Sequence, residues 1–199
     1  MSRLRRKGLP ALLVLACVLP AGSAQAASTE NVAEAVVAQD QTKAFDFAWD
    51  VDRQRGGVLD HLNRAEARAS CTGCEATAIA FQVVLAWGSP NPVVPKNIAV
   101  AVNENCTGCV AAAHARQFVR VLSAPSRFTG AGRAELADVR RDLRALEAQD
   151  LPPGQLFAAV EEQESRVKYV LNHELVLRAD PDEEPEVLDQ ELHQRVDVG

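Results

Sequence analysis

The sequence Cys-Thr-Gly-Cys occurs twice, at residues 71–74 and 106–109, and a similar stretch follows each copy. When Cys71 is aligned with Cys106, the later matches are Ala76, Ala78, Ala80, Gln82 and Val84 with Ala111, Ala113, Ala115, Gln117 and Val119. Upstream, the pattern Asn-x-Ala-x-Ala at 63–67 recurs at 97–101 after a shift of one residue. A match of this length predicts an internal duplication. Two copies are too few for a solenoid, so we expect two similar hairpins about a pseudo-twofold axis.

The conformation of the arms that flank each CTGC turn is ambiguous. The matched alanines recur with a period of two, which favours strands. Residues 111–122, however, also form an amphipathic helix with Ala111, Ala115, Phe118, Val119 and Leu122 on one face. Asp60 is a suitable N-cap for a helix through residues 64–68, and Pro95 suits the start of its counterpart. We therefore expect helices on both sides of each turn, with strands as the alternative.

The first 26 residues have the pattern of an export signal. Four basic residues precede an apolar run at 11–19, and Ala24-Gln25-Ala26 has the form of a cleavage site. The apolar run is too short for a membrane anchor, so we expect no transmembrane segment after the signal is removed. These features predict a protein that is secreted or held in the cell envelope. Cys17 would leave with the signal, and four cysteines would remain.

Composition divides the remaining chain into three parts. Residues 27–43 are polar and rich in alanine, and we expect a flexible lead-in. Residues 44–179 suit a single globular domain that holds the duplicated segments at 63–87 and 97–122. Residues 180–199 carry many acids and two prolines, which predicts a disordered tail. The net charge of the chain is -6, and the absence of a basic patch argues against nucleic acid as a partner.

A short strand is predicted before the first CTGC copy. Over residues 45–52, Phe45, Phe47, Trp49 and Val51 alternate with polar residues that include three aspartates. We expect the aspartates to form a solvated face. If this strand lies at a sheet edge, it could recruit another chain by strand addition.

An antiparallel helical hairpin is predicted over residues 130–178. An apolar seam in its first helix is formed by Leu136, Val139, Leu143 and Leu146. Residues 150–154 read as a turn, and a second helix is expected from about Gln155 to about Arg178.

The four cysteines Cys71, Cys74, Cys106 and Cys109 allow three interpretations. Export into an oxidising compartment favours two disulfides, with three possible connectivities. Four thiolates could instead hold one structural zinc ion, although the gap between the pairs is longer than in most zinc ribbons. A thiol–disulfide oxidoreductase would need only one pair, and no thioredoxin-like order of elements surrounds either copy. We therefore expect disulfides and no cofactor, with one zinc ion as the alternative.

Two glutamines, Gln82 and Gln117, recur at matching positions among apolar residues. A buried amide must first satisfy its own hydrogen bonds, so the simpler interpretation is a structural contact across the pseudo-symmetric interface. The alternative is a contact with a binding partner.

No catalytic motif is complete in this sequence. His173-Glu174 begins like the zinc-protease motif H-E-x-x-H, but Leu177 stands at the second histidine position. The sequence also lacks G-x-S-x-G and a glycine-rich phosphate loop. We expect a protein that is not an enzyme.

The duplicated segment and the predicted hairpin together, over residues 45–178, resemble a group of exported actinobacterial proteins of unassigned function. Some members of that group are labelled as peptide zinc metalloproteases. The resemblance carries over no catalytic residue, because the second zinc ligand of the motif is absent at Leu177.

These observations predict a mainly α-helical fold with two CxxC hairpins, a C-terminal helical hairpin and a short N-terminal β element. An α+β fold with the CxxC arms as strands is the alternative. The predicted function is that of an exported, non-enzymatic structural or binding protein stabilised by disulfides. A zinc-binding or thiol-redox protein that uses the same four cysteines is the alternative. The sequence does not identify a partner, although it is compatible with a protein partner.

Overall fold

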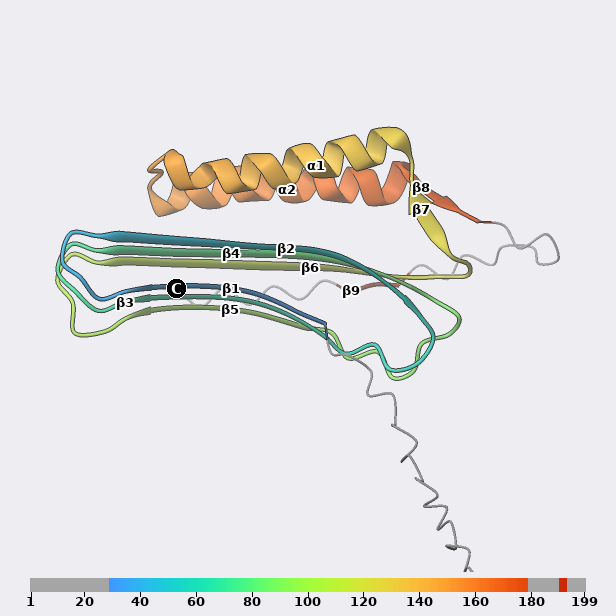
Figure 1. Ribbon diagram of the computed structural model, residues 1–199, viewed down its shortest axis with the longest axis horizontal. Coiled ribbons are helices and arrows are strands. Elements are labelled where there is room, and N and C mark those ends of the chain that lie inside the picture. The colour runs from blue at the N-terminus through green and yellow to red at the C-terminus, as the bar shows by residue number, and fades with distance from the viewer. Residues whose placement is uncertain (1–28, 179–189, 193–199) are drawn as a thin grey trace, which may run out of the picture.

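Two stacked β-sheets and a layer of two helices make up the protein (Figure 1). The computed structural model describes residues 29–178 and 190–192. The predicted signal, 1–26, and most of the predicted tail, 180–199, lie outside the described residues. Sheet 1 contains β1 (Thr29–Val37), β3 (His61–Ala69) and β5 (Lys96–Asn103). Sheet 2 contains β2 (Lys43–Arg55), β4 (Glu75–Trp87), β6 (Val110–Leu122) and β9 (Gln190–Leu192).

The chain alternates between the two sheets and so winds through three parallel coils. Coil 1 is β1 with β2, coil 2 is β3 with β4, and coil 3 is β5 with β6. The prediction of two copies is therefore wrong, because a third copy precedes them. Its sequence, Asn31-x-Ala33-x-Ala35, aligns with Asn63-x-Ala65-x-Ala67 in the parallel register of β1 and β3.

The predicted mainly α-helical fold is also wrong, because the arms of both CTGC turns are strands. Asp60 and Pro95 precede β3 and β5 rather than helices. The cause is that β4 and β6 are covered on both faces, by sheet 1 on one side and by the helices on the other (Figure 1). A strand buried on both faces is nearly continuously apolar, which weakens the alternation that identifies strands in sequences. The predicted flexible lead-in, 27–43, is corrected too, since β1 occupies most of it.

The space between the two sheets is filled by small side chains. Buried alanines from all three coils line it, among them Ala33, Ala65, Ala67, Ala78, Ala80, Ala99, Ala113 and Ala115. Alanine has only a β-carbon, so the two backbones can approach closely. The approach is close enough for the Asn63 side chain in sheet 1 to donate a hydrogen bond to the carbonyl of Ala80 in sheet 2 at 3.1 Å.

A row of three asparagines crosses all three coils inside this space. Asn31 Nδ2 donates to Asn63 Oδ1 at 2.7 Å, and Asn63 Nδ2 donates to Asn97 Oδ1 at 2.8 Å. Asn31 and Asn97 also donate to backbone carbonyls of sheet 2. The amides are buried, and their mutual hydrogen bonds offset the cost of burial and fix the register of the coils.

The outer face of sheet 2 is covered by α1 (Gly130–Ala145) and α2 (Pro153–His173), which are joined through the short 3₁₀ helix η1 (Leu146–Ala148) (Figure 1). Thr129 caps α1 by accepting a hydrogen bond from the Gly132 backbone nitrogen at 3.0 Å. The buried side chains of α1 include Leu136, Val139 and Leu143. They join a core with the outward side chains of β4 and with α2.

The second predicted helix is too long at its C-terminal end. α2 stops at His173, and β8 (Leu175–Leu177) then pairs antiparallel with β7 (Ser126–Phe128). This small sheet ties the exit of α2 to the segment that leads into α1. The start of α1 and the end of α2 are therefore held together by the pairing of β7 with β8.

Candidate functional site

The two CTGC turns are stacked on one side of the solenoid, where β3 leads into β4 and β5 leads into β6. Thr72 and Thr107 form a parallel bridge, and the Gly73 nitrogen donates to the Thr107 carbonyl at 2.9 Å. Gly73 and Gly108 both have positive φ angles, 63° and 66°, which glycine adopts without steric cost. The turns therefore share one conformation and continue the hydrogen-bonded stack of the coils.

The cysteines of each turn lie at disulfide distance from each other. The bonds are Cys71–Cys74 and Cys106–Cys109, with Cα–Cα distances of 5.9 Å and 6.0 Å. Of the three possible connectivities, the structure thus has the one that closes each turn on itself. The two bonds are neighbours, because Cys74 Sγ lies 3.7 Å from Cys109 Sγ.

The one-residue shift between the two copies falls just before the second turn. β5 aligns with β3 at an offset one residue smaller than that of β6 with β4. Asn105, with a positive φ of 50°, lies in the segment that holds the additional residue. The strands on both sides of this segment stay in register.

Coil 1 makes the same turn without cysteines. The register places Gln39 and Thr42 where coil 2 has Cys71 and Cys74. The Thr42 hydroxyl donates to the Gln39 carbonyl at 2.6 Å, and Gln41 has the positive φ, 57°, of the two glycines. The sulfur atoms are therefore confined to coils 2 and 3.

The glutamines Gln82 and Gln117 lie in the interior between the sheets. Gln117 Nε2 donates to Gln82 Oε1 at 2.7 Å and to the His61 carbonyl of sheet 1 at 3.2 Å. Gln82 Nε2 in turn donates to Asp50 in coil 1 at 3.3 Å. The row runs through all three coils, and both glutamines are at least 97% buried. These hydrogen bonds link the two glutamines to each other, to sheet 1 and to coil 1.

The aspartates of β2 do not form the solvated face expected from the sequence. Asp46 and Asp50 point toward sheet 1. One oxygen of Asp46 accepts a hydrogen bond from the Glu34 nitrogen of β1 at 2.7 Å, and the other accepts one from the Phe47 nitrogen of β2 at 2.9 Å. β1 and β2 are the edge strands at the N-terminal end of the solenoid. Asp46 therefore occupies two backbone donors of the coil 1 edge.

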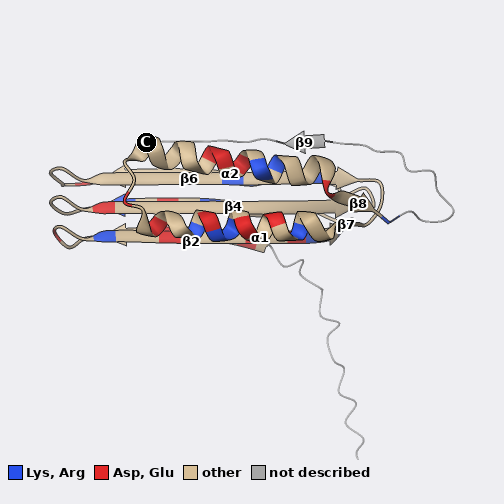
Figure 2. Cartoon of the chain, turned by 90° about the horizontal axis from the view of Figure 1, so that it is seen from above, with Lys and Arg blue, Asp and Glu red and all other residues tan. Residues whose placement is uncertain are grey.

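The opposite edge of sheet 2 accepts an added strand from the same chain. β9 pairs antiparallel with β6, with Gln190, Glu191 and Leu192 opposite Val121, Arg120 and Val119. Figure 2 shows β6 beneath α2, with β4 between β6 and β2. Residues 110–118 of β6 have no second strand partner within the described part of the chain. Sequence reasoning missed this pairing, because its acidic segment reads as a disordered tail.

A buried polar cluster joins the outer face of β6 to α2. His114 Nε2 lies 2.7 Å from Glu164 Oε1, and Arg116 Nε lies 3.3 Å from Glu164 Oε2. Burial disfavours the charged carboxylate, but the hydrogen bond from His114 and the charge of Arg116 outweigh it, so the pKa of Glu164 is lowered. The cluster joins α2 to the edge strand β6.

His61, the first residue of β3, is buried between the sheets on the side of the solenoid opposite the CTGC turns. Its Nε2 lies 3.0 Å from Gln54 Oε1, and its Nδ1 contacts the Thr29 hydroxyl. Burial lowers the pKa of His61 and outweighs the attraction of the carboxylates of Asp52, Asp50 and Asp60. The neutral imidazole suits these contacts, with Nε2 as the donor and Nδ1 as the acceptor.

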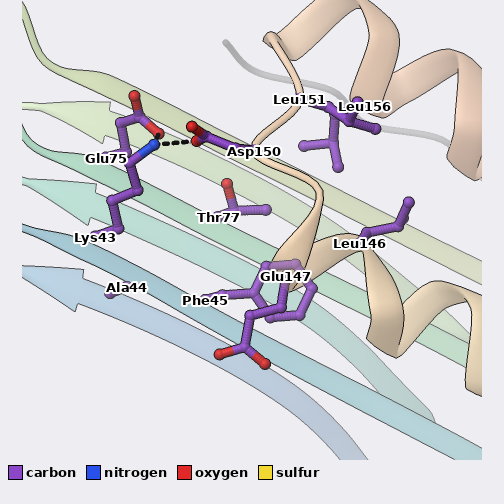
Figure 3. Close-up of a pocket in the computed structure, with 10 residues that line it drawn as sticks. All are labelled: Lys43, Ala44, Phe45, Glu75, Thr77, Leu146, Glu147, Asp150, Leu151 and Leu156. Atoms are coloured by element: carbon purple, nitrogen blue, oxygen red, sulfur yellow. Dashed lines mark hydrogen bonds and ion pairs between the residues drawn. The ribbon is translucent and has the colours of Figure 1, made fainter.

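A small cavity of about 60 Å³ lies where the connection between the helices meets sheet 2 (Figure 3). Lys43 points across its mouth to Asp150 and to Glu75, whose carboxylate lies 2.8 Å from the Lys43 nitrogen. The ammonium group of Lys43 is thus already paired with two carboxylates of the protein. The cavity is too small for an organic ligand, because such pockets usually measure about 300 Å³ or more.

Comparisons with known proteins returned no match among protein-family models, curated proteins or solved structures. Over residues 29–178 and 190–192, no group of three or more His, Cys, Asp or Glu side chains is arranged to hold a metal ion. No helix in the same part of the chain combines the length and the apolar character needed to cross a membrane.

Proposed function

We propose that this chain is an exported, non-enzymatic binding module that takes an extended segment of another chain onto the edge of β6. The observation that carries the proposal is the pairing of β9 with Val119–Val121, in which a strand is already added to this edge. Main-chain hydrogen bonds supply the affinity in such complexes, and alternate side chains supply the specificity.

The two ends of the solenoid differ in a way that favours β6 as the binding edge. At the coil 1 edge, Asp46 occupies the amide donors of Glu34 and Phe47, which is a means by which natural proteins block strand addition. At the coil 3 edge, residues aligned with Asp46 and Asp50 are Ala113 and Gln117. No inward carboxylate stands at either of these two positions of β6.

The side chains of β6 indicate the chemistry of the partner strand. Those facing sheet 1 near the unpaired part are small, namely Ala111, Ala113 and Ala115. Those facing α2 include His114, Arg116 and Arg120. Glu191 lies opposite Arg120 in the register. The small side chains that face sheet 1 favour a partner strand with small residues on that face.

The proposal can be tested by freeing the edge in the full-length chain. Glu191→Pro removes a backbone donor from β9 and should release it from β6. A synthetic peptide of residues 186–194 should then bind the variant about tenfold or more tighter than the unaltered chain, in which β9 competes at high effective concentration. Fluorescence anisotropy of a labelled peptide gives both affinities.

Val196→Pro is the matched control, because it places a proline in the same terminal segment outside β9. It should leave the affinity unchanged. Failure of the peptide to bind the Glu191→Pro chain, while that chain keeps its β-sheet circular dichroism, would refute the proposal. A peptide with its order of residues scrambled should not bind.

A further inference from the structure

The turns that carry the four cysteines are held together by backbone hydrogen bonds as well as by sulfur. The Gly73 nitrogen donates to the Thr107 carbonyl, and the Val110 nitrogen donates to the Cys74 carbonyl, each at 2.9 Å. β4 and β6 continue this pairing without interruption from Glu75 and Val110. Opening of the disulfides therefore leaves both turns stacked, with four thiols on two adjacent coils.

With both disulfides closed, the four cysteines do not form a metal site, but one separation between their sulfurs already matches that of a tetrahedral zinc site. A zinc ion with Zn–S bonds of about 2.3 Å separates its sulfur ligands by about 3.8 Å. Cys74 Sγ and Cys109 Sγ, which belong to different turns and are not bonded to each other, already lie 3.7 Å apart. The paired cysteines have Cα–Cα distances of 5.9 Å and 6.0 Å. Rotation about the side-chain torsions can bring their sulfurs from bonding distance to ligand distance without moving the backbone.

Access to the site is possible from one side. Cys71 and Cys74 are buried, with 6% and 0% exposure, whereas Cys106 and Cys109 are partly exposed. A reductant and then an ion would therefore reach the turn of coil 3 first. Coil 1 supplies Gln39 and Thr42 at the equivalent positions, so it adds no thiolate to the site.

We propose that the two CTGC turns form a redox-controlled zinc site, closed as two disulfides when oxidised and able to bind one Zn²⁺ when reduced. A dithiol reductant supplies two electrons and two protons to each disulfide and is itself oxidised to a disulfide. The four thiols then bind Zn²⁺ as thiolates and release their four protons. The ion joins coil 2 to coil 3, whereas each disulfide joins a turn only to itself.

The test uses the full-length chain, reduced with a dithiol and freed of reductant under inert gas. Titration with Co²⁺, which replaces zinc in tetrahedral thiolate sites, should produce visible d–d absorption that saturates at one ion per chain. Added Zn²⁺ should abolish this absorption. Native mass spectrometry of the reduced chain should show one bound zinc ion.

Variants separate a shared site from two independent pairs. Cys106→Ser with Cys109→Ser should abolish the tetrahedral absorption, because two thiolates remain on coil 2. Cys109→His keeps four ligands and should restore an absorption shifted from that of the unaltered chain. Thr42→Ser is the matched control at the equivalent position in coil 1 and should change nothing.

Three results would overturn the proposal. The first is that the reduced chain binds neither Co²⁺ nor Zn²⁺. The second is that the double serine variant retains the absorption, and the third is that two ions bind per chain. In each variant, retention of the β-sheet circular dichroism distinguishes a lost ligand from a lost fold.

Discussion

The carboxylate of Asp46 in β2 accepts a hydrogen bond from the backbone nitrogen of Glu34 in β1 at 2.7 Å, so one inward acid protects the edge of both sheets of coil 1. Asp46→Ala should release these donors and let coil 1 of one molecule stack on coil 3 of another. Such a head-to-tail contact does not close on itself, so we expect concentration-dependent oligomers. Sedimentation velocity measures them.

Glu34→Ala is the matched control for this variant. It removes an exposed carboxylate from the same edge but keeps the backbone nitrogen and its bond to Asp46. This control should remain in the oligomeric state of the unaltered chain. If Asp46→Ala also does so, then Asp46 has no protective role.

The asparagine row predicts a large loss of stability when its central member is removed. Asn63 accepts from Asn31 and donates to Asn97 and to the Ala80 carbonyl. Asn63→Ala leaves buried polar groups in all three coils with fewer partners and should lower the free energy of unfolding by about 2 kcal/mol. Urea denaturation gives the value. Asn103→Ala, at the exposed end of β5, should cost much less.

In the buried cluster between β6 and α2, we expect the carboxylate of Glu164 to be needed to balance the charge of Arg116. Glu164→Gln leaves Arg116 without the anion that lies 3.3 Å away, and should lower the free energy of unfolding by about 3 kcal/mol. Thermal and urea denaturation check this value. Glu162→Gln, on the exposed side of the same helix, is the control. Equal stability of the two variants would show that the cluster contributes nothing.

The lowered pKa of His61 predicts a loss of stability in mild acid. In the unfolded chain, histidine takes up a proton near its usual pKa of about 6.5, whereas the buried imidazole does not. The unfolded state then binds more protons, so the free energy of unfolding falls as the pH drops below about 6.5. His61→Gln should flatten this dependence between about pH 7 and about pH 5. His173→Gln, at an exposed histidine, should leave the slope unchanged.

The repeated CTGC sequence identifies two of the three coils, and the one-residue shift seen in the sequence recurs in the register of the strands. The first coil was missed because it has no cysteines, although its Asn31-x-Ala33-x-Ala35 pattern was a usable signal. The spacing of apolar residues over 111–122 predicts an amphipathic helix, but this segment is the strand β6, in which the polar residues Arg116 and Gln117 are also buried. Arg116 is buried against Glu164, a residue from a helix far along the chain, and Gln117 lies in an interior row. Local periodicity cannot anticipate partners supplied by such distant segments.

The acidity of the C-terminal segment had a similar effect. Its composition predicts disorder, and composition alone does not show that β6 offers an edge to residues 190–192. The edge exists only once three coils have stacked. The pairing of β9 with β6 can therefore be identified from the fold but not from the sequence of either strand.

Hydrogen exchange of the β6 backbone is the measurement that tests strand addition most directly. In the unaltered full-length chain, amides within residues 119–121 should exchange slowly because β9 covers this edge. Glu191→Pro should accelerate their exchange, and saturating peptide of residues 186–194 should restore the protection and extend it toward Val110. The amides of β4, which lie between two strands, should stay protected throughout. Unchanged exchange of residues 119–121 in the variant, with or without peptide, would contradict the account of β6 as a binding edge.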